Sequence, residues 1–167
     1  MDKKIRLLQV IPRLDVGGAE TGCKDIAQFI ANQNYFSAIL CSGGEQIKNI
    51  DQTKIKIFKF SVHSKNPFMI FFNIFVILFI VLFYKINIIH VRSRAPAWSC
   101  YFASKLLGVS LISTFHGTYN FNNPLKKFYN SVMLRGNSVI AGSRFIFDHI
   151  KNNYNYSKEI FLIPRGI

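Results

Sequence analysis

The sequence contains no Asp or Glu between residues 52 and 147, although that stretch carries twelve Lys and Arg residues. Over the whole chain of 167 residues the formal net charge is +13. Such an excess of one sign favours an anionic partner: a phosphate-bearing substrate, an anionic lipid surface or a nucleic acid. A background composition rich in lysine is the alternative explanation. Because no nucleic-acid-binding motif or basic helix accompanies the charge, we expect no nucleic-acid partner.

Cysteine and histidine are also scarce. The cysteines, Cys23, Cys41 and Cys100, are odd in number and widely spaced, so they indicate neither a disulfide framework nor a zinc site and favour a reducing cytosol. The four histidines show no metal-ligand spacing, and we therefore expect no metal and no cofactor. The apolar run before Pro12 has five residues, which is too short for a signal-peptide core and is typical of a strand.

Short apolar runs alternate with helical patterns along the rest of the chain. Strands are predicted at residues 5–11, 36–41, 55–60, 87–91, 111–115, 138–141 and 160–163, and helices at 19–33, 67–84, 97–107, 124–134 and 143–152. This alternation implies right-handed crossovers between parallel strands. We therefore expect an α/β, Rossmann-like parallel sheet with helices on both faces, formed by one domain over residues 1–167.

The predicted helix at residues 67–84 is apolar on every side except at Asn73. Asn66 is a suitable cap, and Pro67 suits the first helical turn. Three interpretations stay open. The run falls slightly short of the roughly 20 residues that a transmembrane span needs. It would serve as a very hydrophobic core helix, or as a helix whose outer face rests in a membrane interface with help from Lys65 and Lys85.

Three motifs follow predicted strands, at the edge where open parallel sheets bind their ligands. Gly17-Gly18 lies between the first strand and the first helix, where glycine lets a backbone approach a phosphate and the helix N-terminus attracts anions. Arg92 and Arg94 follow a later strand and are able to fork onto phosphate or carboxylate groups. His116, before Gly117, is placed to reach a ligand hydroxyl or to oppose developing charge. A tight turn, surface arginines and a structural histidine are the alternative readings.

As a set, these motifs resemble the N-terminal, acceptor-side domain of retaining glycosyltransferases of the GT4 type, which have the GT-B fold. The resemblance rests on GGAE at residues 17–20 and on HVRSRAPAWS, STFHGTYN, NSVIAGSRF and IPRGI, which occur in the matching order over nearly the whole chain. It is closest to bacterial enzymes that build lipopolysaccharide or other surface glycans. It implies a nucleotide-sugar donor and a glycan or lipid-linked acceptor. From the cysteines and the membrane-facing interpretation of the helix at 67–84, we expect a cytoplasmic protein that is peripheral on the inner face of the cytoplasmic membrane and meets its anionic surface.

The resemblance also implies roles for individual residues. Gly17 and Gly18 would face the donor diphosphate, and His116 would lie beside the donor sugar as the catalytic residue. Arg92, Arg94 and Tyr119 are candidates for binding the acceptor. Transfer would proceed with retention of configuration, without a metal, through orientation and stabilisation of the departing diphosphate.

Two alternatives remain at this stage. One is a stand-alone module that docks on membranes or pairs with a separate donor-binding subunit. The other is a sugar-nucleotide epimerase, which would share the sheet but not the HVRSRAPAWS loop.

The resemblance predicts that this chain is inactive by itself. The donor-binding domain of the family, with its paired glutamates in an E-x7-E motif, would begin after residue 167. Purified protein mixed with nucleotide-sugars and acceptor should therefore transfer little or no sugar, because the groups that grip the nucleotide are missing. Robust turnover in a radiolabelled-sugar transfer assay would contradict this expectation.

Overall fold

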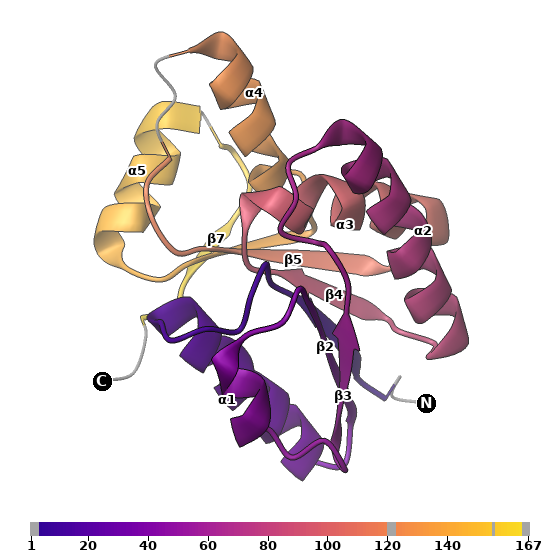
Figure 1. The fold of residues 1–167 in the computed structure, drawn as a ribbon. Helices are drawn as coiled ribbons and strands as arrows, with labels where there is room; N and C mark the ends of the chain where they lie inside the picture. Colours follow the sequence, from indigo (N-terminus) through magenta and orange to yellow (C-terminus); the bar gives the residue numbers. More distant parts are fainter. Residues whose placement is uncertain (1–3, 120–122, 155, 165–167) are drawn as a thin grey trace.

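The computed structural model describes residues 4–119, 123–154 and 156–164. Its centre is a seven-stranded sheet in which every strand pairs in parallel, in the order β3-β2-β1-β4-β5-β6-β7 (Figure 1). The strands are β1 (Arg6–Val10), β2 (Phe36–Cys41), β3 (Ile55–Lys59), β4 (Ile88–Val91), β5 (Ser110–Phe115), β6 (Ser138–Ala141) and β7 (Ile160–Leu162). The predicted Rossmann-like α/β fold is confirmed, and each strand lies within a residue or two of its predicted bounds.

The helices connect the strands as the sequence predicts. They are α1 (Gly18–Asn32), α2 (Pro67–Phe83), α3 (Arg94–Leu107), α4 (Pro124–Ser131) and α5 (Arg144–Tyr154), with short 3-10 helices η1 (Glu45–Asn49) and η2 (Val132–Leu134). α3 begins three residues before its predicted start, because Ala95 and Pro96 are buried in its first turn and belong to the core. The segment η1 was not predicted, since its five residues are too few to show a helical period.

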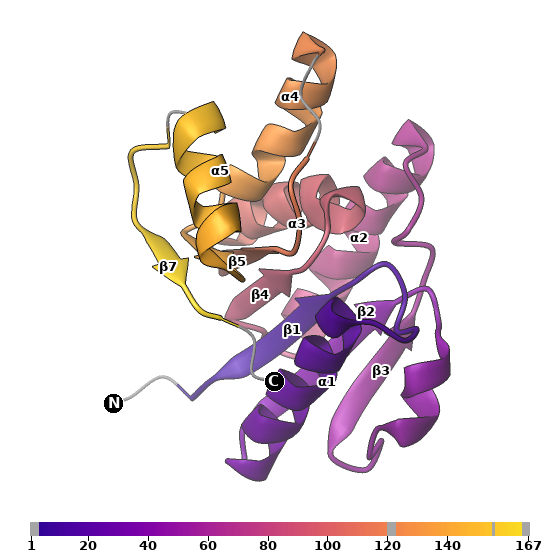
Figure 2. The same ribbon diagram turned by 90° about the vertical axis from the view of Figure 1, so that its left-hand side faces the viewer.

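Helices cover both faces of the sheet, and each face has its own core. On one face α1 and η1 pack over β1, β2 and β3, around residues such as Leu14, Ala27 and Ile39. On the other face α2, α3, η2 and α5 pack over the sheet, around residues such as Ile77 and Phe115 (Figure 2). Buried parallel strands require cover on both sides, which explains why most residues of β1 and β2 are apolar and buried.

The helices cover the two faces of the sheet unevenly. Within the part of the chain that the structure describes, no helix packs on the α1 side of β5, β6 and β7. Ile112 and Ile140 are therefore only half-buried there, and Phe161 and Ile163 are exposed. This difference leaves open space beside α1, and the candidate site borders it.

Local contacts of two asparagines explain where helix α2 begins and which of its sides faces the core. The side chain of Asn66 accepts a hydrogen bond from the Phe68 amide at 2.9 Å, and Pro67 occupies the first turn, as predicted. Asn73 is buried, and its amide nitrogen donates to the Ser61 carbonyl at 3.2 Å, whereas its Oδ1 has no hydrogen-bond partner among the described residues. Within the described residues, no helix combines the length and the apolar character that a membrane crossing requires.

We predict that the inner and outer sides of α2 differ sharply in their contribution to stability. Ile77→Ala should lower the free energy of unfolding by about 2–5 kcal/mol, because Ile77 is fully buried and a cavity would remain. Phe79→Ala is the comparison; because Phe79 is 64% exposed, its removal should cost less than about 0.5 kcal/mol. Urea unfolding of both variants measures the difference, and equal losses would contradict this packing of α2.

Candidate functional site

The strand order reverses between β1 and β4, where the chain first builds outward to β3 and then crosses to the other side of β1. In an open parallel sheet the loops at the carboxyl ends of such neighbouring strands diverge and leave a crevice. The loop after β1 contains Gly17, and the residues after β4 include Arg92. The motifs selected from the sequence therefore lie at the edge where the topology places a ligand site.

Backbone hydrogen bonds hold the loop after β1 against the loop after β2. The Leu14 amide donates to the Gly43 carbonyl at 2.8 Å, and the Gln46 amide donates to the Leu14 carbonyl at the same distance. Gly44 packs so closely on the Leu14 backbone that a Cβ atom would overlap it, and its φ of 139° also favours glycine. The loop that leads to Gly17 is thus fixed at its base by a glycine contact.

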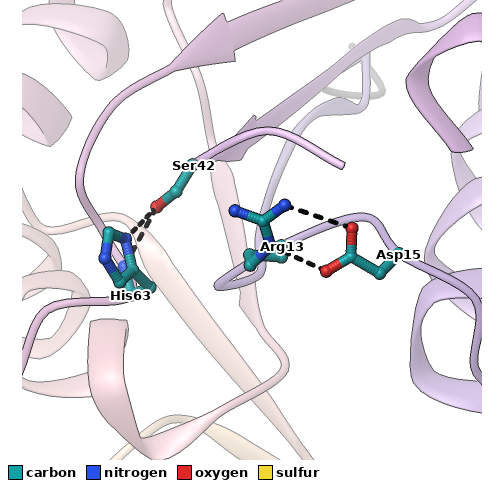
Figure 3. Close-up of polar contacts among 4 residues, drawn as sticks. All are labelled: Arg13, Asp15, Ser42 and His63. Carbon is teal, nitrogen blue, oxygen red and sulfur yellow. Dashed lines mark hydrogen bonds and ion pairs between the residues drawn. The ribbon is translucent and has the colours of Figure 1, made fainter. Parts of the chain in front are cut away.

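Two polar pairs brace the same region (Figure 3). Arg13 Nε donates to Asp15 Oδ2 at 2.7 Å on the exposed loop, and this ion pair lowers the pKa of the Asp15 carboxyl. His63 Nδ1 lies 2.7 Å from the Ser42 hydroxyl, which itself donates to the Phe60 carbonyl. The first pair lies within the loop after β1, and the second joins the segments that follow β2 and β3.

Gly17 and Gly18 lie where α1 begins. Gly17 precedes the helix in extended backbone, and Gly18 is its first residue. The Glu20 carboxylate lies directly over Gly17, in the place that a Cβ atom would occupy. A carboxylate in the first turn is favourable because the amide groups of a helix N-terminus attract negative charge. A phosphate could reach these amide groups only after the Glu20 carboxylate moved away, because two anionic groups repel each other.

Gly18, Arg92 and His116 line one cleft of about 500 Å³ between α1 and the open part of the sheet. The other residues that line it are Thr21, Gly22, Asp25, Ile26, His90, Thr114, Ile140, Gly142, Ile163 and Pro164. One wall is the N-terminal half of α1, and the opposite wall is formed by the ends of β6 and β7. The structure therefore brings Gly18, Arg92 and His116 together, whereas Gly17, the other expected donor residue, precedes α1 and is not among the residues that line the cleft.

Arg92 points inward more than the sequence suggested. Its side chain is 5% exposed, its Nε donates to the Gln9 amide oxygen at 2.8 Å, and its Nη2 donates to the Gly22 carbonyl at 3.2 Å. Gln9 in turn donates to the Cys23 carbonyl at 2.8 Å. This buried network connects β4, β1 and α1. Arg92 therefore positions the first turns of α1 while it lines the cleft.

His90 and Thr114 belong to the cleft but were not selected from the sequence. Their side chains lie 2.7 Å apart, between His90 Nε2 and Thr114 Oγ1. Burial lowers the pKa of His90 well below its ordinary value, and the nearby charges of Arg92 and His116 act in the same direction, so the imidazole is neutral. The alternation of side chains along a strand was a signal that could have found them. His90 lies two residues before Arg92, and Thr114 lies two residues before His116, so each shares a face of the sheet with a residue that was selected.

Arg94 and Tyr119 form a separate pair on the other side of the sheet edge. The Arg94 guanidinium lies 4.2 Å from the centre of the Tyr119 ring and donates to Asn130 Oδ1 of α4 at 2.9 Å. Burial raises the pKa of Tyr119 to about 12, so its phenol stays protonated. Asn120 and residues 165–167 of the quoted motifs lie outside the described residues. The three residues expected to bind the acceptor are thus divided between two places.

Potential metal ligands do not cluster in the described part of the chain. Across residues 4–119, 123–154 and 156–164, no three His, Cys, Asp or Glu side chains gather in a way that could hold an ion. The expectation that no metal takes part stays a prediction.

Comparison with known proteins identifies relatives of the chain as a whole. The model of Glycosyltransferase Family 4 matches residues 16–167. No curated protein matches the chain. Among solved structures, a glycosyltransferase from Rickettsia africae ESF-5 is 38% identical with a TM-score of 0.85, over 98% of this chain and 44% of that one. The chain therefore spans less than half the length of this relative.

Two more distant structures share the fold. Anabaena Alr3699/HepE, solved with UDP and glucose, is 14% identical with a TM-score of 0.71, over 98% of this chain and 45% of that one. The lipopolysaccharide outer core galactosyltransferase WaaB, in its apo form, is 12% identical with a TM-score of 0.69, over 98% of this chain and 46% of that one.

The neutral state of His90 predicts that stability falls in mild acid. The folded-state pKa of His90 lies below the unfolded value of 6.5, so below that pH the unfolded chain binds a proton that the folded chain does not. The free energy of unfolding should drop by up to about 1.4 kcal/mol per pH unit. Burial also lowers the pKa of His149, which adds to the trend.

Urea unfolding at about pH 7.5 and about pH 5.5 measures this dependence. His90→Gln should show a smaller loss of stability between the two values, because the variant has no imidazole at that position to protonate. An identical pH slope in the variant would contradict the assignment to His90.

We also predict that the contact between Gly44 and Leu14 fixes the loop before α1. Gly44→Ala should destabilise the fold by more than about 2 kcal/mol, since a backbone overlap adds to the strain of a positive φ. Gly43→Ala is a matched control: its φ of 117° carries similar strain, but nothing lies within 4 Å of the added Cβ, so about 1 kcal/mol is expected. Thermal unfolding of the two variants separates overlap from strain; equal losses would exclude the overlap.

Proposed function

Because the chain belongs to glycosyltransferase family 4, we propose that it forms the acceptor-side part of a retaining enzyme that transfers a sugar from a nucleotide-sugar to a surface-glycan or lipid-linked acceptor. The observation that carries the proposal is the cleft beside α1, where Gly18 at a helix N-terminus faces the same space as His116. One side of this cleft suits a phosphate and the other offers an imidazole to a sugar, which are the two parts of such a donor.

The donor in this proposal binds through its diphosphate at Gly17 and Gly18. Amide groups at the start of α1 donate to the phosphate oxygens, and the positive end of the helix dipole stabilises their charge. Charge develops on this diphosphate as the sugar departs, so the same amides lower the barrier to transfer. Support for a uridine nucleotide comes from Alr3699/HepE, which was solved with UDP and glucose and shares the fold.

His116 acts on the sugar in this proposal. It is half-buried at the end of β5, and its position on the cleft allows its ring to contact a sugar hydroxyl next to the reacting carbon. A hydrogen bond there orients the donor and opposes the charge that develops as the bond to the diphosphate breaks. The buried His90–Thr114 pair and Arg92 keep the cleft wall and α1 in place around it.

The acceptor binds on the other side of the edge, at Arg94 and Tyr119. Arg94 Nη1 is held by Asn130, and the remaining N–H groups of the guanidinium are the donors that we assign to the acceptor. The protonated Tyr119 phenol offers a hydroxyl beside them. WaaB, a lipopolysaccharide galactosyltransferase of the same fold, supports a saccharide on a lipid as the acceptor class.

His116→Ala tests the proposal in the longest reading frame that contains residues 1–167. Loss of one contact that acts in the transition state should lower kcat by about 10²–10³-fold, with a smaller change in KM for the donor. The assay follows transfer from UDP-sugars to lipid-linked saccharides. His63→Ala is the control, because His63 lies at the same edge but contacts Ser42 and not the cleft, and it should retain kcat within about threefold.

If His116→Ala and His63→Ala changed kcat equally, His116 would have no specific role in sugar transfer. Hydrolysis of the nucleotide-sugar without transfer to any saccharide would instead contradict the assignment of an acceptor site.

A further inference from the structure

Helix α2 carries an apolar face that the described part of the chain leaves exposed. Its exposed residues follow a helical spacing on the side opposite the buried Ile77, and each is between 53% and 86% exposed. They are Phe68, Phe71, Phe72, Phe75, Phe79, Leu82 and Phe83. Exposed apolar patches of this kind mark interaction sites in soluble proteins, whereas single exposed apolar residues do not.

The apolar face continues onto the neighbouring helices. Helix α3 packs beside α2, where the Ser99 hydroxyl donates to the Ile70 carbonyl at 2.8 Å. Phe102 of α3 stacks on Trp98, whose ring centre lies 5.4 Å from that of Phe128 of α4. The exposed residues on these two helices are Phe102, Leu106, Leu125 and Phe128. We call the exposed apolar residues of α2, α3 and α4 together the aromatic face.

The charged residues of the segments that form the aromatic face are all of one sign. The three helices lie within residues 52–147, where the sequence has no Asp or Glu. Lys65 and Lys85 are exposed just beyond the two ends of α2. Exposed basic residues also accompany the other two helices: Lys105, Lys126, Lys127 and Arg135. An apolar surface bordered by cations and free of carboxylates matches the interface of an anionic membrane, where rings enter the acyl boundary and lysines meet the headgroups.

We propose that the aromatic face docks this protein on an anionic lipid bilayer. A second copy of the chain fits the surface less well, because pairing two such faces would bring two cationic, carboxylate-free borders together. The anionic lipids of the cytoplasmic leaflet provide the opposite charge. Docking would therefore hold the protein as a peripheral protein on the inner face of the cytoplasmic membrane.

The direction of the helices gives this docking a consequence for the site. Helices α2 and α4 follow the carboxyl ends of β3 and β5, so both begin at the edge that carries Arg94 and Tyr119. Phe68 and Leu125, which are 86% and 77% exposed, lie in the first turns of these helices. A docked molecule holds this edge near the lipid surface, within reach of an acceptor anchored by a lipid. This consequence rests on the proposed function, whereas the docking itself does not.

Vesicle flotation without any sugar or nucleotide tests the docking. The 167-residue chain should float with vesicles that contain phosphatidylglycerol and should bind phosphatidylcholine vesicles at least about tenfold more weakly. Phe79→Glu should weaken binding to the anionic vesicles about tenfold or more, because a carboxylate would enter the interface. Phe29→Glu is the matched control, since Phe29 on α1 is 63% exposed against 64% for Phe79 and lies on the opposite side of the sheet.

Phe29→Glu should bind as the unchanged protein does, and circular dichroism should show that both variants keep the same helix content. Three results would overturn the proposal. They are a failure of the unchanged protein to float, equal weakening by the two substitutions, and a stable dimer that Phe79→Glu converts to a monomer. Because the test contains no donor, a loss of transferase activity in His116→Ala leaves its result unaffected, and the two proposals fail separately.

Discussion

The requirement that a parallel strand be buried on both faces determines most of this structure. Because neighbouring strands are parallel, a crossover must bring the chain from the carboxyl end of each strand back to the side where the amino ends lie. All seven carboxyl ends consequently meet along one edge. Gly17, Arg92 and His116 come from distant parts of the sequence, yet the topology alone places them on adjacent loops. The candidate site is thus a result of how the sheet is covered.

The uneven cover of the sheet accounts for the shape of the cleft. On the α1 side, the helix protects β1 and its neighbours, while Ile140 of β6 and Ile163 after β7 keep part of their apolar surface exposed. The cleft between the side of α1 and the uncovered face of the sheet therefore has apolar walls, and it opens toward the loops at the carboxyl ends of the strands. The buried Arg92 lies beneath this cleft and hydrogen-bonds the α1 backbone, so the opening does not loosen the start of α1. An internal polar network therefore maintains rigidity where apolar packing is incomplete.

The fold could be predicted from the sequence because its signals are local. Apolar runs of strand length, Asn66 with Pro67, and the alternation of elements each require only neighbouring residues to interpret. The site was predicted less completely, because side-chain direction depends on which face of the sheet each residue occupies. Arg92 and Arg94 are two residues apart. Arg92 directly follows β4 and its side chain contacts α1, whereas Arg94 begins α3 and contacts α4 on the opposite side of the sheet. Alternation would place residues two apart on the same face, so it could not separate the two arginines. The start of α3 at Arg94 separates them, and their partners Gln9 and Asn130 lie far away along the chain.

Helix α2 illustrates a second limit of sequence reasoning and a way past it. Its composition is apolar on all sides, so the sequence alone cannot tell which side faces the core. The structure separates the sides: the inner side holds Asn73 bonded to Ser61, and the outer side holds the row of phenylalanines. A buried N–H group costs free energy unless it is paired, so the bond from the Asn73 amide nitrogen to Ser61 favours this rotation of the helix. The outward phenylalanines are consequently a defined surface, and the lack of carboxylates in the surrounding sequence gives that surface its chemical character. The sequence suggested a membrane-facing helix, and the fold identifies which side of that helix faces outward.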